Sequence, residues 1–122
     1  MTVTIDDLQA DLRQFARDRD WDQFHTPKNL AMALAGEVGE LTELFQWLTP
    51  AQSADVMADD KRAEDVRHEL ADVFAYLLRL ADVLHVDLET ALRDKLTVNA
   101  QRYPVEEVRG RAVKYTELGA DQ

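Results

Sequence analysis

Apolar residues recur every three or four positions along most of the chain, which is the period of an amphipathic α-helix. The pattern covers four segments: Ile5 to Arg19, Thr26 to about Trp47, Lys61 to Leu84, and Leu88 to Arg102. Runs of β-branched residues that would indicate strands are absent from the sequence. The pattern therefore predicts an all-α protein, a four-helix bundle.

Residues typical of helix ends stand at the boundaries of these segments. Thr4 and Asp87 are good N-caps for the first and fourth helices, and Thr26 is a cap followed by Pro27 at the first helical position. The fourth helix must end before Pro104, because the residue preceding a proline avoids helical backbone angles. The helix boundaries are thus predicted independently of the apolar period.

The segments between and after the helices differ in character. Residues 20–25 are unusually aromatic for a connector, whereas residues 49–60 are polar and favour a mobile loop. The tail from Val105 onward is weakly patterned, and we expect contact with a partner to order it. We interpret residues 1–122 as a single domain, with 103–122 as a candidate extended tail.

Cysteine is absent, which excludes disulfides and thiolate metal sites. No apolar run approaches the ~20 residues that a membrane span requires. The first residues lack the basic and then apolar stretches of a secretory signal. We therefore expect a cytoplasmic protein that has no membrane partner.

The charge is strongly negative, with 14 Lys and Arg against 24 Asp and Glu and a formal net charge of −10. Such a surface repels nucleic acid polymers, so we expect no partner of that class. A small phosphate ligand remains compatible with this charge, because a metal ion can reverse the field inside one cleft.

Two carboxylates interrupt the apolar stripe of the helix predicted from Thr26. Four leucines form that stripe: Leu30, Leu34, Leu41 and Leu44. At about 100° per residue, Glu37 lies in the middle of the stripe and Glu40 lies one turn further on at its edge. The helix predicted from Lys61 repeats the arrangement, with Glu69 on its apolar side and Asp72 three residues on. Both helices therefore carry a carboxylate-x-x-carboxylate pair.

Carboxylates on an apolar face need a counter-charge, because burying an unpaired one costs several kcal/mol. Basic residues that could neutralise these four are missing from the same faces. An isolated pair of this kind usually marks a solvated helix face. Two pairs that each intrude into an apolar stripe favour a metal site, and an all-oxygen ligand set suits Mg²⁺, with Mn²⁺ as a substitute.

The order of motifs resembles a known family. Glu37-x-x-Glu40, Glu69-x-x-Asp72 and then Lys95-x-x-x-Asn99 are similar to the motifs of the MazG-like all-α nucleoside triphosphate pyrophosphohydrolases. Segments 21–30 and 36–47, with their two tryptophans, resemble the dCTP pyrophosphatase branch, as do the endings at 102–104 and 114–118. The loop from Thr49 to Glu64 does not match in detail.

The resemblance implies hydrolysis of a deoxynucleoside triphosphate to the monophosphate and pyrophosphate, with Mg²⁺ and in a homotetramer. It implies a role for each matching position. The metal ligands would be Glu37, Glu40, Glu69 and Asp72. The base and sugar pocket would be lined by Trp21, His25, Trp47 and Tyr76. The phosphates would meet Lys95, Asn99 and Arg102.

The chemistry of these residue types agrees with that assignment. Glu40 is our candidate for the carboxylate that orients or deprotonates the attacking water. Lys95 and Asn99 share one helix face, where both can stabilise charge on the phosphate chain. Lys95 taken alone is more often a solvated lysine, and Trp47 taken alone is as readily a core residue.

Two other functions remain open at this stage. The nearer is a MazG-like hydrolase of broad specificity, or one that prefers dUTP or a damaged nucleotide. The other is a non-catalytic helical module that binds metal or a protein partner. A nucleotide panel assayed with Mg²⁺ distinguishes all three.

Overall fold

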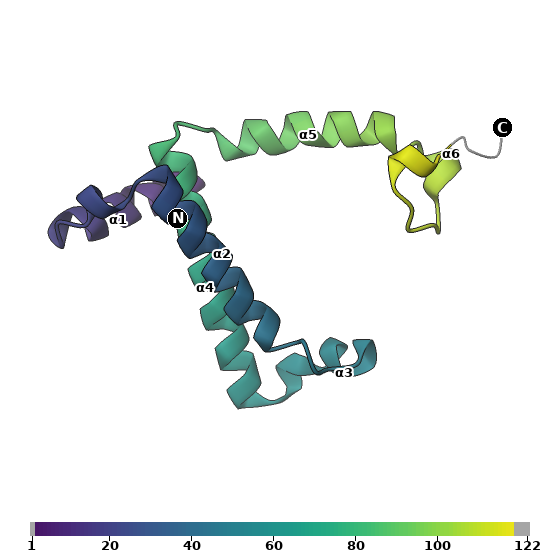
Figure 1. Ribbon diagram of the computed structural model, residues 1–122, viewed down its shortest axis with the longest axis horizontal. Coiled ribbons are helices and arrows are strands. Elements are labelled where there is room, and N and C mark those ends of the chain that lie inside the picture. Colours follow the sequence, from purple (N-terminus) through teal and green to yellow (C-terminus); the bar gives the residue numbers. More distant parts are fainter. Residues whose placement is uncertain (1, 119–122) are drawn as a thin grey trace. The chain divides into compact units, whose positions relative to one another are not determined.

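The computed structural model describes residues 2–118, and every regular element in that range is helical. The all-α prediction is confirmed (Figure 1). The long helices are α1 (Ile5–Asp18), α2 (Pro27–Glu43), α4 (Asp60–Val83) and α5 (Leu88–Arg102). The short ones are α3 (Pro50–Ala54) and α6 (Val105–Val108), with 3-10 turns η1 (Asp22–Phe24), η2 (Val56–Ala58) and η3 (Tyr115–Glu117).

The predicted caps are the caps that the structure uses. The Thr4 hydroxyl accepts from the amide of Asp7, whose carboxylate accepts from the amide of Thr4, and this closes a capping box at α1. The Thr26 hydroxyl caps α2, and the Asp87 carboxylate caps α5. Local side-chain chemistry therefore fixes where these helices begin.

The prediction that the second helix continues to about Trp47 is wrong, because α2 ends at Glu43. The amides of Leu44 and Phe45 bond carbonyls only three residues back, which tightens the chain into turns. The segment predicted as a mobile loop contains α3 and η2. Thr49 and Gln52 form a second capping box there, and Val56 is buried.

The chain divides into two compact units, one ending at Val86 and one beginning at Asp87. In the first unit, α2 lies along α4, and α1 also packs on α4 (Figure 1). The Gln9 side chain donates a hydrogen bond to the Leu78 carbonyl at 3.0 Å and ties α1 to α4. The core is formed by Ala16, Leu30, Val56, Ala63, Val66, Leu78 and Ala81.

The second unit consists of α5 and the segment that follows it, as far as Leu118. Its tail makes contacts within the unit: the rings of Tyr103 and Tyr115 meet edge to face at 6.1 Å. The Arg102 guanidinium lies 4.4 Å from the centre of the Tyr115 ring, a cation–π contact. The expectation that contact with a partner orders this tail stays a prediction. Residues 119–122 of the predicted tail lie outside the described residues.

Among the helices of residues 2–118, none is both long enough and apolar enough to cross a membrane.

Candidate functional site

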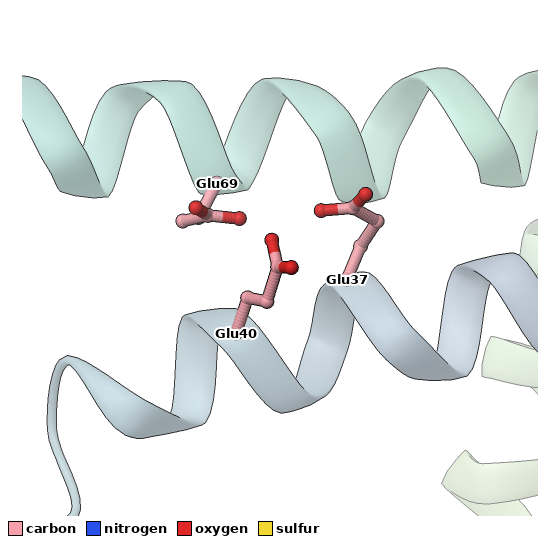
Figure 2. Close-up of side chains that lie close together, drawn as sticks. All are labelled: Glu37, Glu40 and Glu69. Atoms are coloured by element: carbon pink, nitrogen blue, oxygen red, sulfur yellow. The ribbon is translucent and has the colours of Figure 1, made fainter.

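Three of the predicted carboxylates meet between α2 and α4. Glu37 and Glu40 extend from α2 and Glu69 from α4, and one oxygen of each lies within 4.8 Å of the others (Figure 2). The two α2 residues share a face because they are three positions apart. The packing of α2 along α4 then sets Glu69 against them.

This carboxylate cluster, Glu37, Glu40 and Glu69, is electrostatically unfavourable as it stands. One buried oxygen each of Glu37 and Glu69 has no hydrogen-bond partner among the described residues. Burial, and then interaction with Glu40, raise the pKa of Glu37 to about 7. Burial and the nearby charge of Glu40 also raise the pKa of Glu69. Clustered oxygens that lack partners fit a divalent cation, which would satisfy and neutralise them together.

Asp72 stands slightly apart from the cluster. It is not among the residues whose oxygens lie within 4.8 Å of one another, although its charge contributes to the raised pKa values of Glu37 and Glu69. Its side chain is exposed and lines a neighbouring pocket. Its role as a fourth metal ligand stays a prediction.

Divalent cations are expected to stabilise the folded protein, because a site assembled from two helices does not exist in the unfolded chain. At Mg²⁺ or Mn²⁺ about a hundredfold above the dissociation constant, the gain of about 2.7 kcal/mol corresponds to a rise of about 10 °C in Tm. Calorimetry with and without EDTA measures the shift. Glu69→Gln should abolish most of the shift, and an undiminished shift in that variant would place the bound cation elsewhere.

The metal-free protein should also lose stability as pH rises from about 4.5 to 7. The pKa of Glu37 is about 7 in the folded protein, against a reference value of 4.5, so the folded state keeps this proton to higher pH than the unfolded state does. The free energy of unfolding therefore falls as that proton is lost. In EDTA, Glu37→Gln should match the wild type below pH 4.5 and exceed it increasingly towards pH 7 in urea unfolding. Parallel pH profiles would contradict the burial of Glu37.

A pocket of about 270 Å³ lies beside Asp72 in the first unit. It brings together Trp21, His25 and Tyr76, three of the residues predicted to bind base and sugar. The other lining residues are Leu12, Phe15, Ala16, Asp72, Ala75 and Arg79. We call this the aromatic pocket. Its walls are largely flat rings and aliphatic carbons, which suit a planar heterocycle.

The connector before α2 is shaped to present Trp21 and His25. Asp20 has a left-handed backbone (φ 54°), and the amide of Trp21 donates back to the Ala16 carbonyl at 2.9 Å. The Trp21 ring then packs edge to face on the Phe15 ring, with 5.8 Å between the ring centres. The centre of the His25 ring lies 6.4 Å from that of the Trp21 ring. The aromatic connector noted in the sequence is thus an ordered wall of the pocket.

Arg79 is a site residue that sequence reasoning missed. Its side chain is only 8% exposed, and it donates to His25 Nδ1 at 3.1 Å and to Asp22 at 2.8 Å. Burial lowers the pKa of His25, as does the positive charge of Arg79. The signal was in the sequence, because Asp72, Tyr76 and Arg79 follow the i, i+4, i+7 spacing of one helix face.

Trp47 does not line the aromatic pocket. It is 87% exposed and borders a different hollow, together with Val56 and Val66. Such exposure is incompatible with a core residue of this chain, which removes that alternative. A role for Trp47 in nucleotide binding stays a prediction.

The residues predicted to meet phosphates all lie on α5, in the second unit. Lys95 is exposed and Asn99 is half-buried one turn later, so the shared face that the sequence predicts is present. Arg102 stacks on Tyr115 at the end of the helix. Their contact with a ligand stays a prediction.

Comparison with known proteins gives a consistent result. The model of the MazG-like family matches residues 33–118. Over 115 residues, the chain is 48% identical to dCTP pyrophosphatase 1 of Rattus norvegicus and 44% identical to that of Homo sapiens, covering 94% of this chain and 68% of each relative. A solved pyrophosphatase from Archaeoglobus fulgidus superposes with a TM-score of 0.77 at 37% identity, covering 85% of this chain and 95% of that one. The motifs, the helical fold and these similarities together establish that the chain belongs to the MazG-like family.

Proposed function

We propose that the protein is a Mg²⁺-dependent nucleoside triphosphate pyrophosphohydrolase that converts dCTP, or dCTP modified on the cytosine ring, to the monophosphate and pyrophosphate. The observation that carries the proposal is the carboxylate cluster near the aromatic pocket. Asp72 links the two, because it lines the pocket and its charge contributes to the raised pKa of Glu37. Relatives named dCTP pyrophosphatase 1 support the enzyme class and the choice of nucleotide.

The carboxylates account for how a polyanion can bind to an acidic protein. Glu37, Glu40, Glu69 and Asp72 would hold Mg²⁺, which when bound neutralises charge on the triphosphate and makes the attacked phosphorus more electrophilic. Glu40 is exposed, so it can reach a water molecule that enters with the substrate. In our proposal Glu40 orients that water and accepts its proton as the new P–O bond forms, while the P–O bond that links the α- and β-phosphates breaks and pyrophosphate is released.

The remaining residues bind and position the nucleotide. Trp21 and Tyr76 provide ring faces against which a base can stack, and His25 provides a polar edge. Lys95 and Asn99 would stabilise negative charge on the phosphate chain, and Arg102 would add a further cation.

Pyrophosphate release across a nucleotide panel, with Mg²⁺ or EDTA, tests the proposal. We expect release that requires the cation and is fastest with dCTP. Equal rates across the panel, or a preference for dUTP, would support a MazG-like hydrolase of other specificity. Absence of release from every nucleotide would support a non-catalytic metal-binding or interaction module.

We also propose that the protein is a homotetramer. Large apolar side chains remain exposed on both units, including Leu70 and Phe74 on α4 and Leu92 and Leu96 on α5. No α5 residue is buried within the described chain, although four-helix proteins bury an apolar stripe of each helix. Contact between copies would cover these side chains.

The oligomer can be measured directly. Multi-angle light scattering at micromolar concentration should give a mass near four times 13.9 kDa. Phe74→Glu should shift the mass to a smaller species, because a charge would be buried in the interface. A wild-type protein that stays monomeric under these conditions would refute the tetramer.

A further inference from the structure

Arg79 forms a network that the proposed hydrolytic chemistry does not use. Its Nε–H donates to His25 Nδ1 at 3.1 Å, while its terminal nitrogens reach Asp22 at 2.8 Å and Asp82 at 3.4 Å. Arg13 binds the same Asp82 carboxylate at 2.9 Å. A buried arginine thus connects α4 to the connector that carries the aromatic wall.

The chemistry of the two side chains fixes the proton on His25. A guanidinium has only donors, so the Nδ1 atom that it meets must present a lone pair. That excludes both the imidazolium and the tautomer protonated on Nδ1. The neutral ring then carries its proton on Nε2, and its remaining polar group is a hydrogen-bond donor.

We propose that Arg79 is a positioning residue that holds His25 as the neutral Nε2–H tautomer, so that the aromatic pocket offers a donor to an acceptor atom on the bound base. The inference deepens the proposed function and rests on it for the identity of the ligand. Acceptors of the right class are a ring carbonyl or an unprotonated ring nitrogen, and a cytosine base displays both.

The charges around His25 agree with this role. Arg79 and burial disfavour protonation of the ring, whereas the Asp22 carboxylate favours it. Asp72 also borders the pocket, and Asp82 and Arg13 extend the network behind Arg79. With Arg79 removed, the acidic groups near the ring would dominate, and the imidazole would gain a second proton more readily.

Nitrogen NMR of the full-length protein tests the assignment without any nucleotide. The chain has three histidines, so the ring signals of His25 can be assigned individually. At about pH 8 His25 should show the pattern of the Nε2–H tautomer, and on acidification it should protonate at lower pH than an unperturbed imidazole. In Arg79→Met the His25 ring should protonate at higher pH than in the wild type. A proton on Nδ1 of the wild-type ring at that pH would overturn the proposal.

A double-mutant cycle separates positioning from general structural support. Arg79→Met should raise KM for dCTP about tenfold, the cost of one hydrogen bond, with little change in kcat. In a His25→Ala background the same substitution should change KM less than about twofold, because the ring that it positions is gone. An equal loss in both backgrounds would show that Arg79 acts only on the fold.

Arg79→Met should fold, because each carboxylate that loses its contact with Arg79 is stabilised in another way. Asp82 retains Arg13, and the Asp22 side chain is half-exposed to water. Arg13→Met is the matched control: it removes an ion pair of the same network without touching His25, so KM and the His25 titration should stay as in the wild type. If dCTP is not hydrolysed at all, the proposed function fails, while the NMR measurement still decides whether Arg79 fixes the tautomer.

Discussion

Glu37→Gln is expected to lower kcat by about a thousandfold. Glu37 contributes to the carboxylate cluster from the centre of α2, with one oxygen buried and without a partner. The amide keeps the shape of the side chain but has one oxygen fewer and no negative charge with which to hold a cation. Loss of several kcal/mol of transition-state stabilisation by a metal corresponds to a rate reduction of this size. Steady-state pyrophosphate release with Mg²⁺ measures it.

The structure offers a matched control on the same helix. Glu43 is exposed at the last turn of α2 and is not among the clustered carboxylates. Glu43→Gln makes the same chemical change and should leave kcat within about twofold, because surface substitutions of this kind have small effects. Circular dichroism should show unchanged helix content in both variants. Comparable losses in the two variants would remove the cluster from the mechanism.

Asp72→Asn applies the same reasoning to a residue whose assignment is less direct. Asp72 lies outside the 4.8 Å group but close enough for its charge to raise the pKa of Glu69. If Asp72 is a metal ligand, Asp72→Asn should lower kcat about as much as Glu37→Gln does. A wild-type rate in this variant would limit the ligand set to the three clustered residues.

The helices could be predicted from sequence because their signals are local. Thr4, Thr26 and Asp87 cap helices in the structure as their side chains suggested, and α5 has the predicted bounds. The end of α2 could not be predicted, because Leu44 and Phe45 continue the apolar period although their amides bond in turns. The spacing of apolar residues indicates which side chains face inward, but it does not indicate where the backbone stops being helical.

The site was predictable to the extent that it depends on helix geometry. Glu37 and Glu40 share a face at i and i+3, so only the approach of Glu69 required the fold. The spacing of Arg79 from Asp72 and Tyr76 places the three on one helix face, but the contact of Arg79 with His25, 54 residues away, could not be predicted from spacing. Trp47 was grouped with Trp21 because the two tryptophans flank the carboxylate motif of the second helix. In the structure they line different pockets, which their places in the sequence do not indicate.

The second large effect that we expect concerns the base. Trp21→Ala should raise KM for dCTP by about tenfold to a hundredfold, since stacking a base on an aromatic ring contributes about 1–3 kcal/mol. The indole is 43% exposed and lines the aromatic pocket, so a ligand can reach its surface. Stacking acts on ground and transition states alike, so kcat should change much less than KM. Trp47→Ala provides a comparison with the other tryptophan, and an equal rise in KM would indicate that it too meets the base.

The same pocket leads us to expect that dCTP is hydrolysed better than dATP or dGTP. We expect the flat aromatic and aliphatic walls of this pocket to fit a single pyrimidine ring better than a purine. Discrimination by apolar fit alone is about 1–3 kcal/mol, or about tenfold to two-hundredfold in kcat/KM. The ratio of dCTP to dUTP is a separate measurement, because these bases have the same ring size and differ in their hydrogen-bonding edges. Rates for the four deoxynucleotides and dUTP, measured with the wild type and Trp21→Ala, test the preference for pyrimidines over purines and the ratio of dCTP to dUTP. A flat or purine-favouring profile in the wild type would refute the pyrimidine pocket and leave the metal chemistry of Glu37, Glu40 and Glu69 standing.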